Sequence, residues 1–371
     1  MEYRTIKQES RPISLLGFGC MRLPRITPDR PEVDMAKFQE MVDYAYANGV
    51  NYFDTAYPYH KGLSELAVGE ALQKYPRESF FLADKMPGWD VKTLEDADRI
   101  FEEQLKKCRV EYFDFYLCHA LGEENYKIYR EIDIYGLLRR KKAEGKIRHL
   151  GFSSHADVAL LEEICGAHEW DFAQIQLNYL DWTMQNAKKQ YEILERHGLP
   201  CIIMEPVRGG ALATLCKSGV EALSAREPES TPASWAIRFA ASLPNVMTVL
   251  SGMTTMEHMQ DNVKTMSPFR PLSAEENELL LEVAEMYKKS RTIPCTACRY
   301  CMDCASGVDI PAMFALYNGY MLTEDEDALL AGGNTATSCV ECGVCAPNCP
   351  QGIDIPGSLK DVVRLIESVS K

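Results

Sequence analysis

Cysteine shows the clearest chemical pattern in this chain of 371 residues. Eight of its 14 cysteines lie between positions 295 and 349, in two runs with short, regular gaps. The runs read Cys295-x2-Cys298-x2-Cys301-x2-Cys304 and Cys339-x2-Cys342-x2-Cys345-x3-Cys349-Pro350. The second run has the spacing and the proline typical of [4Fe–4S] binding in bacteria, where the fourth cysteine binds the other cluster of a pair. The spacing therefore predicts two [4Fe–4S] clusters.

The same rule predicts that each cluster takes three ligands from one run and one from the other. The predicted sets are Cys295, Cys298, Cys301 and Cys349, and Cys339, Cys342, Cys345 and Cys304. Zinc is the alternative, because Cys-x2-Cys pairs also form tetrahedral zinc sites. A cluster with a purely structural role also stays open.

An internal repeat follows both runs. Gly307-Val308-Asp309-Ile310-Pro311 begins three residues after Cys304, and Gly352-Ile353-Asp354-Ile355-Pro356 begins three residues after Cys349. The first run departs from the ferredoxin pattern, because its last gap is one residue shorter and Ala305 replaces the proline. We interpret the two halves as duplicated cluster-binding units joined by a helical insert. Residues 291–371 resemble an α-helical ferredoxin domain.

Ionisable and polar side chains form a second pattern, since they stand where successive apolar runs end. Tyr59 follows the second of these runs by five residues, and the ends of the runs carry Asp54, Lys85, His119, Ser153, Ser154, Gln174, Asn178, Glu205 and Ser251. Each residue alone has a structural explanation, such as an ion pair or a satisfied buried histidine. Four ionisable types at successive run ends are difficult to explain by packing.

The elements that must position these residues alternate regularly along the chain. Apolar runs typical of strands cover 15–20, 52–54, 80–85, 113–119, 148–153, 172–178, 201–205 and 247–251. Helical patterns cover 33–48, 64–74, 94–108, 131–143, 156–165, 186–197, 232–242 and 255–265. Eight such units predict an α/β protein, a (β/α)8 TIM barrel, whose chemistry would lie at the carboxyl ends of its strands. A doubly wound open sheet is the alternative, although no strand–Gly-x-Gly-x-x-Gly–helix unit is present.

A domain boundary is expected near Ser273, which opens a long helical pattern that ends near Lys289. We therefore predict a barrel over residues 1–272. Residues 273–371 would form a linker helix and a mainly α-helical ferredoxin-like iron–sulfur domain.

Several motifs resemble the aldo-keto reductase superfamily over roughly residues 1–270. They are Asn51-Tyr52-Phe53-Asp54-Thr55-Ala56-Tyr57-Pro58-Tyr59, Gly62-Leu63-Ser64-Glu65, Lys85, Asp114-Phe115-Tyr116-Leu117-Cys118-His119, Gly151-Phe152-Ser153-Ser154 and Gln174-Ile175-Gln176-Leu177-Asn178. The whole chain resembles the branch of that family that is fused to a ferredoxin tail. The resemblance implies a catalytic tetrad of Asp54, Tyr59, Lys85 and His119.

The chemistry of carbonyl reduction fits this implied tetrad. Hydride transfer from NAD(P)H leaves charge on the carbonyl oxygen, which Tyr59 would protonate. Since an isolated tyrosine has a pKa near ~10, a cation at Lys85 is expected to lower that pKa. Asp54 would hold the lysine in place, and His119 would donate a hydrogen bond to the carbonyl oxygen.

The resemblance also implies a cofactor site. Ser153, Ser154 and Gln174 would contact the nicotinamide carboxamide. Barrel loops that commonly bind phosphate would here contain Arg208, Gly210, Ser251 and Gly252, with Asn262 in the following helix. Tight turns are the alternative for the glycines. Met204 stands where many relatives stack a tyrosine on the nicotinamide. Because Gly252 and His258 stand where NADPH-specific relatives have Lys and Arg, a preference for NADPH is not supported.

The two predicted parts use different electron chemistry, because nicotinamide passes a hydride and each cluster passes one electron. A flavin could join them, but no flavin motif is visible. The barrel is expected to reduce a small-molecule carbonyl, either linked through the clusters to a redox partner protein or beside clusters that are structural or sense oxygen. The alternative is an electron-transfer or regulatory binding subunit whose barrel no longer turns over.

Composition excludes several other classes of protein. The net charge is −14, and the longest basic run is Arg139-Arg140-Lys141-Lys142, which is interpreted as the solvated end of a helix. Nucleic acid is therefore not an expected partner. No apolar run reaches the roughly 20 residues of a membrane helix, and the amino-terminal segment lacks the apolar core of a signal peptide. A cytoplasmic location is expected.

Overall fold

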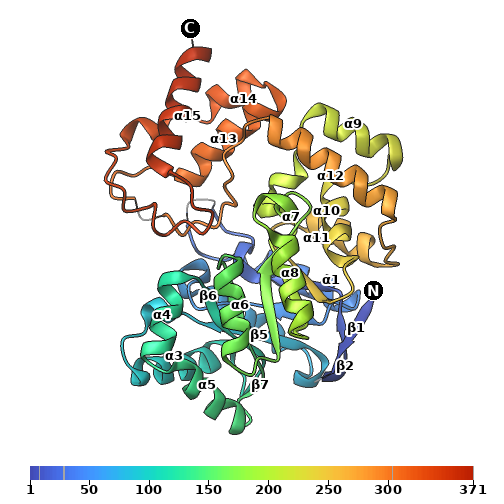
Figure 1. The fold of residues 1–371 in the computed structure, drawn as a ribbon, viewed down its shortest axis with the longest axis vertical. Helices are drawn as coiled ribbons and strands as arrows, with labels where there is room; N and C mark the ends of the chain where they lie inside the picture. The colour runs from blue at the N-terminus through green and yellow to red at the C-terminus, as the bar shows by residue number, and fades with distance from the viewer. Residues whose placement is uncertain (8, 28–29, 303, 371) are drawn as a thin grey trace. The chain divides into compact units, whose positions relative to one another are not determined.

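The computed structural model describes residues 1–7, 9–27, 30–302 and 304–370 and contains a closed parallel barrel (Figure 1). Its strands are β3 (Leu16–Gly19), β4 (Tyr52–Asp54), β5 (Phe81–Met86), β6 (Phe113–Leu121), β7 (Ile147–Ser154), β8 (Phe172–Gln176), β9 (Cys201–Met204) and β10 (Val246–Ser251). They follow one another in chain order around the barrel, and β10 closes it against β3. The predicted (β/α)8 barrel is therefore confirmed, and the open sheet is wrong.

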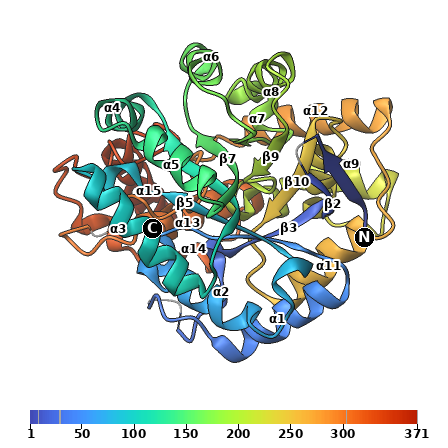
Figure 2. The same cartoon turned by 90° about the horizontal axis from the view of Figure 1, so that it is seen from below.

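Helices surround the strands of this barrel (Figure 2). They include α1 (Met35–Ala47), α2 (Ser64–Leu72), α3 (Leu94–Cys108), α4 (Glu123–Glu131), α5 (Ile134–Ala143), α6 (Val158–Ala167), α7 (Asp181–Met184), α8 (Ala187–Arg196) and α11 (Met256–Met266). Local sequence explains their ends. Thr93 and Asp96 form a capping box at the start of α3, and Gly145 and Gly198 take positive φ just beyond α5 and α8.

The barrel differs from the sequence-based expectation in three places. The helical pattern at 131–143 forms only α5, and α4 precedes it as a separate helix. The last turn of α5 is not simply solvated, because the side chain of Lys141 is buried and bonded to Asp98 and Glu102. The hairpin of β1 (Tyr3–Ile6) and β2 (Glu9–Ser14) had no counterpart in the prediction.

This hairpin contributes directly to the core of the barrel. Ile13 of β2 packs among the side chains of the barrel strands, including Tyr52 and Phe115. Arg11 of the same strand forms an ion pair of 2.7 Å with Asp114, which is fully buried at the start of β6. Arg77 and Arg148 also bind Asp114, at 2.6 and 3.4 Å. One buried carboxylate thus joins three arginines from separate parts of the chain.

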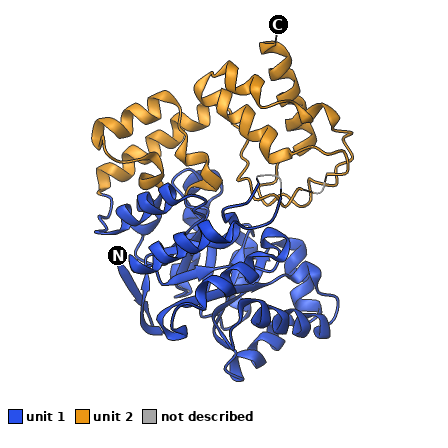
Figure 3. Cartoon of the chain, turned by 180° about the vertical axis from the view of Figure 1, so that it is seen from behind, with its two compact units in different colours: residues 1–206, 237–272 blue, residues 207–236, 273–371 orange. Residues whose placement is uncertain are grey.

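Contacts divide the chain into two compact units, coloured separately in Figure 3. Unit 1 contains residues 1–206 and 237–272, and unit 2 contains residues 207–236 and 273–371. Residues 207–236 thus group with the cysteine-rich part, whereas the predicted barrel domain included them. The assignment of domains to 1–272 and 273–371 stays a prediction.

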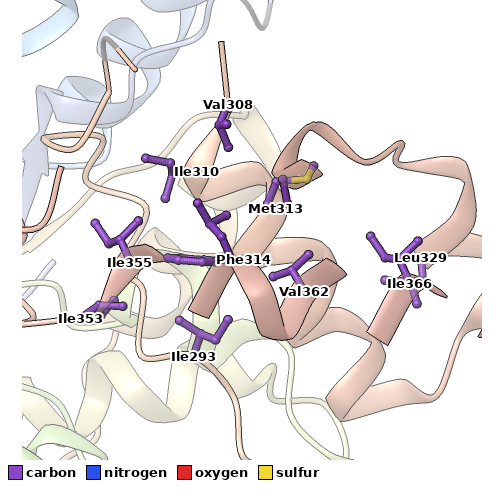
Figure 4. Packing of buried hydrophobic residues seen from close by; sticks show 12 residues of the cluster. Ile293, Val308, Ile310, Met313, Phe314, Leu329, Ile353, Ile355, Val362 and Ile366 are labelled. Carbon is purple, nitrogen blue, oxygen red and sulfur yellow. The ribbon is translucent and has the colours of Figure 1, made fainter. Parts of the chain in front are cut away.

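Unit 2 has its own apolar core. Its helices include α9 (Lys217–Arg226), α12 (Ala274–Lys289), α13 (Ile310–Thr323), α14 (Glu326–Ala331) and α15 (Ile355–Val369), and α10 (Pro232–Ala241) spans a boundary between the units. The helices α13 and α15 each follow a cysteine run and both contribute to this core. Phe314 of α13 lies among its buried side chains (Figure 4). Six of the eight run cysteines pack against this apolar core, namely Cys295, Cys301, Cys304, Cys339, Cys345 and Cys349.

A membrane-spanning helix is not found among the described residues, because none of their helices is both long enough and apolar enough.

The network at Asp114 generates a stability prediction. Asp114→Asn should lower the free energy of unfolding by about 3 kcal/mol, because three arginines lose a buried carboxylate partner. Glu162→Gln is the matched control, since Glu162 also binds two basic side chains but is exposed. Urea denaturation followed by fluorescence measures both losses. A loss for Asp114→Asn no larger than that for Glu162→Gln would contradict this account.

Candidate active site and cysteine sites

A buried ion pair lies at the carboxyl ends of two neighbouring strands. Lys85 of β5 is 0% exposed, and its Nζ lies 2.5 Å from Oδ1 of Asp54 at the end of β4. The same Nζ donates to the carbonyl of Thr55 at 2.6 Å. Because Asp54 pairs in register with Ala83, Lys85 stands two residues further along on the same face of the sheet. Burial raises the pKa of Asp54, and the Lys85 cation opposes this change.

The aromatic rings of Tyr59 and His119 lie beside this ion pair. Nζ of Lys85 is 5.0 Å from the centroid of the Tyr59 ring. The rings of Tyr59 and His119 meet edge to face, with centroids 6.1 Å apart. All four residues of the predicted tetrad therefore come together at one end of the barrel.

The electrostatics of Tyr59 differ from the expectation. Burial, followed by the negative charge of Asp54, raises the pKa of Tyr59 well above its ordinary value. The predicted lowering of the Tyr59 pKa by Lys85 is therefore wrong, because Asp54 balances the lysine charge and the Tyr59 ring is only 9% exposed. Burial and the nearby Lys85 cation lower the pKa of His119 well below its ordinary value, so its imidazole is neutral.

Left-handed backbone directly follows both aromatic residues. His60 and Ala120 have φ of 53° and 52°, which are uncommon for residues other than glycine. Side chains hold both turns in place. The backbone N–H of Leu23 donates to Nε2 of His60 at 3.1 Å, and the N–H of Ala120 donates to Oγ of Ser153 at 2.7 Å. Such strain is typical of functional sites, where surrounding contacts maintain it.

Four of the predicted cofactor contacts lie at the ends of β7, β8 and β9. Oγ of Ser153 accepts from the backbone N–H of Ala120, and Oγ of Ser154 donates to the carbonyl of Leu121 at 3.3 Å. Nε2 of Gln174 lies 3.5 Å from Sδ of Met204, whereas the buried Oε1 of Gln174 has no hydrogen-bond partner in the described part of the chain. This free acceptor is available to a ligand with N–H groups.

Most of the predicted cofactor contacts near the end of β10 and beyond it have structural hydrogen bonds of their own. Nδ2 of Asn262 donates to Oγ of Ser251 at 2.8 Å, inside the barrel unit. The backbone N–H of His258 takes part in the cap of α11. The nearest atoms to a Cβ at Gly252 would be those of the Arg22 side chain, at an ordinary van der Waals distance of 3.5 Å. Arg208 and Gly210 belong to unit 2 and are described with it.

One ion pair near Tyr59 was missed by the sequence analysis. Nη2 of Arg22 lies 2.7 Å from Oε1 of Glu205, whose φ is also positive at 56°. The two charges have opposite effects on the pKa of Tyr59, since Glu205 raises it and Arg22 lowers it. Glu205 was visible at a strand end, but nothing in the sequence indicated Arg22 as its partner. Trp89 also reaches this region, with its ring 5.0 Å from that of His119.

The cysteines of unit 2 interact in the two predicted sets. Burial raises the pKa of the Cys301 thiol to about 12, and part of the increase comes from Cys298, Cys295 and Cys349. Burial likewise raises the pKa of Cys345, with contributions from Cys339, Cys342 and Cys304. The assignment of the crossed ligand sets stays a prediction. A cavity lined by all four cysteines of the first set lies in the same unit.

The two cysteine runs also have matching backbone conformations. Left-handed residues follow the second cysteine of each run, at Arg299 and Gly343, and precede it, at Ala297 and Glu341. The repeat also starts the following helices, because Asp309 caps α13 and Asp354 caps α15. The segments that carry the two runs thus share one local design.

No three His, Cys, Asp or Glu side chains in the described ranges lie close enough together to hold a single metal ion. A [4Fe–4S] cluster differs from a single ion, because each of its four thiolates binds a different iron.

Comparisons with protein families match both parts of the chain. The family described as "Aldo/keto reductase family" matches residues 15–285. The family described as "4Fe-4S dicluster domain" matches residues 294–354, which contain all eight run cysteines.

Curated relatives are similar mainly to the barrel. "Probable aldo-keto reductase 1" of Glycine max is 28% identical over 207 residues, covering 53% of this chain and 57% of the relative. The chain thus spans little more than half of that protein. "NADH-specific methylglyoxal reductase" of Escherichia coli is 26% identical over 319 residues, covering 75% of this chain and 96% of the relative.

Solved structures show the same fold. The holo form of an aldo-keto reductase from Bacillus halodurans has a TM-score of 0.63 at 24% identity, covering 76% of this chain and 96% of that one. A thermostable aldo-keto reductase solved with the inhibitor epalrestat has a TM-score of 0.64 at 23% identity, covering 76% of this chain and all of that one.

The crossed cysteine sets can be tested by double substitution. Cys298→Ala with Cys349→Ala should leave about half of the iron, because both residues belong to one predicted set. Cys298→Ala with Cys304→Ala should remove nearly all of it, because each residue belongs to a different set. Iron and acid-labile sulfide per chain after anaerobic purification measure the difference. The reverse order of iron contents would show that each run holds its own cluster.

Proposed function

The chain belongs to the aldo/keto reductase family and carries a C-terminal 4Fe-4S dicluster domain, and we propose that it reduces a small-molecule carbonyl compound with NAD(P)H. The observation that carries this proposal is the grouping of Asp54, Tyr59, Lys85 and His119 at one end of the barrel. In the proposed reaction the carbonyl carbon gains a hydride and its oxygen gains a proton from Tyr59. The product is an alcohol. NAD(P)H would be oxidised to NAD(P)⁺, and Tyr59 would regain its proton from solvent.

Tyr59 suits the role of proton donor. Because burial and Asp54 raise its pKa, the hydroxyl stays protonated throughout the neutral range. As it releases a proton, negative charge develops on a ring whose centroid lies 5.0 Å from Nζ of Lys85. The site is buried, and the attraction between this charge and the ammonium group is therefore stronger than it would be in water. Asp54 and the carbonyl of Thr55 keep the ammonium group in place.

His119 suits the role of a neutral hydrogen-bond donor. Its low pKa keeps the ring uncharged, so it can orient a carbonyl oxygen without competing with Tyr59 as an acid. Its position is well defined, because its backbone N–H donates to Oη of Tyr129 at 2.8 Å and its carbonyl accepts from Asn125 at 2.6 Å.

The residues at the ends of β7 to β9 fit a nicotinamide. The buried, unpartnered Oε1 of Gln174 could accept an N–H of the carboxamide, with Ser153 and Ser154 next to it on the adjacent strand β7. The nicotinamide, when bound, supplies the hydride. Met204 would lie against it, in place of an aromatic ring.

Two [4Fe–4S] clusters would be held by the crossed cysteine sets. Their role in electron transfer is supported by exposure, since Cys342 is exposed and its neighbours Val340 and Val344 are 70% and 71% exposed. Exposed apolar side chains beside a cluster ligand suit transient contact with a partner protein. The proposed function therefore includes electron exchange between the second set and a redox partner.

Substitution of Tyr59 tests the reductase directly. Tyr59→Phe should lower the turnover of an aldehyde with NADH or NADPH by about 100-fold to 10,000-fold, because the proton donor is lost. Tyr57→Phe is the matched control and should retain activity, since its hydroxyl donates to Glu103 on α3. Steady-state kinetics with a panel of aldehydes and ketones measures both. Equal activity of the Tyr59→Phe variant and the unchanged protein would contradict the proposal.

The pH profile gives an independent prediction. Because the pKa of His119 lies below and that of Tyr59 lies above the neutral range, turnover should be flat between about pH 6 and 9. Kinetics with saturating substrate in buffers of constant ionic strength provide the measurement. A fall in activity centred near pH 6.5 that His119→Gln removes would show a titrating histidine and refute this assignment.

A further inference from the structure

The loop at residues 208–210 packs against both segments that supply the first cysteine set. Arg208 is only 2% exposed, and its Nη2 donates to Oε1 of Gln351 at 3.2 Å. Gln351 stands two residues after Cys349. Gly209 has a positive φ of 65°, and a Cβ there would lie 2.0 Å from the carbonyl oxygen of Thr296. Thr296 directly follows Cys295 in the other segment.

A glycine is therefore required at position 209 by the close approach of the cysteine segment. From the sequence, this loop is predicted to contact a phosphate or to form a tight turn. Two of its contacts within unit 2 indicate a different role, since they lead to Thr296 beside Cys295 and to Gln351 near Cys349.

We propose that Arg208 raises the reduction potential of the cluster bound by Cys295, Cys298, Cys301 and Cys349. The guanidinium group of an arginine carries a positive charge. Reduction adds one electron, and thus one negative charge, to the cluster, and the potential of such clusters depends on charge, hydrogen bonds and burial. A buried cation beside the ligand segments stabilises the reduced form, because low solvent exposure weakens screening.

The second set has a different charge environment. Glu341 stands between Cys339 and Cys342, and its carboxylate pairs with Lys360 at 2.7 Å. Both side chains of this pair are about half exposed, so solvent screens them. Because Arg208 binds Gln351, two residues after Cys349, we expect its effect to be larger on the cluster of the first set.

This inference rests on the cluster part of the proposed function and is independent of carbonyl reduction. The test is a potentiometric titration of the full-length protein, purified anaerobically, with dithionite as electron donor and electron paramagnetic resonance as readout. Iron and sulfide contents are measured first, because their absence in the unchanged protein would refute the clusters themselves rather than the role of Arg208.

Arg208→Met should shift one of the two reduction steps to lower potential and move the other less. Arg208→Lys keeps the charge and should retain most of the original potential. Arg226→Met is the matched control, because Arg226 lies on α9 of the same unit but is exposed, and neither step should move. Arg208→Gln provides a second neutral variant if Arg208→Met does not fold.

Two results would overturn the proposal. In the first, a neutral variant that keeps its iron leaves both steps unchanged or moves both equally. In the second, both neutral variants lose the iron of one cluster while Arg208→Lys keeps it, which would make Arg208 a structural residue of the site.

Discussion

A lysine ammonium with no solvent exposure sets the main constraint on the barrel. Lys85 can be buried only because Asp54 and the carbonyl of Thr55 surround its Nζ. The parallel register of β4 and β5 creates this arrangement by placing both side chains at the same end of neighbouring strands. Tyr59 and His119 then lie in the field of a charge pair that is nearly neutral as a whole. Both rings are uncharged at rest, and the Lys85 ammonium lies beside the Tyr59 ring.

The sequence predicts the barrel well because its strands are short and mostly buried, with many apolar residues. Strands 52–54 and 113–119 appear almost unchanged as β4 and β6, and the polar residues after them meet as expected. The cysteine repeat is equally readable, because spacing and chain order determine which segments can share a cluster. Even the repeated Asp-Ile-Pro starts two helices in the same way.

Features that depend on tertiary contacts are not readable from the sequence. The β1–β2 hairpin contains Arg11 and Pro12, which do not form an apolar alternation, and only packing of Ile13 reveals its purpose. The pairing of Arg22 with Glu205 joins positions 183 residues apart. The pKa of Tyr59 was predicted in the wrong direction, because sequence shows the neighbouring cation but not the burial that outweighs it. Similarly, the sequence does not show that Thr296 approaches Gly209 so closely that a side chain there would meet it.

The proposed hydride chemistry at the barrel can be followed by isotope transfer. NADH or NADPH carrying deuterium on the transferable position of the ring would be incubated anaerobically with the protein and an aldehyde, and the alcohol analysed by mass spectrometry and NMR. Direct hydride transfer predicts deuterium on the carbinol carbon, with Tyr59→Phe forming this product much more slowly. Product that carries only solvent hydrogen at that carbon would show that electrons arrive singly, through the clusters, and would contradict the account.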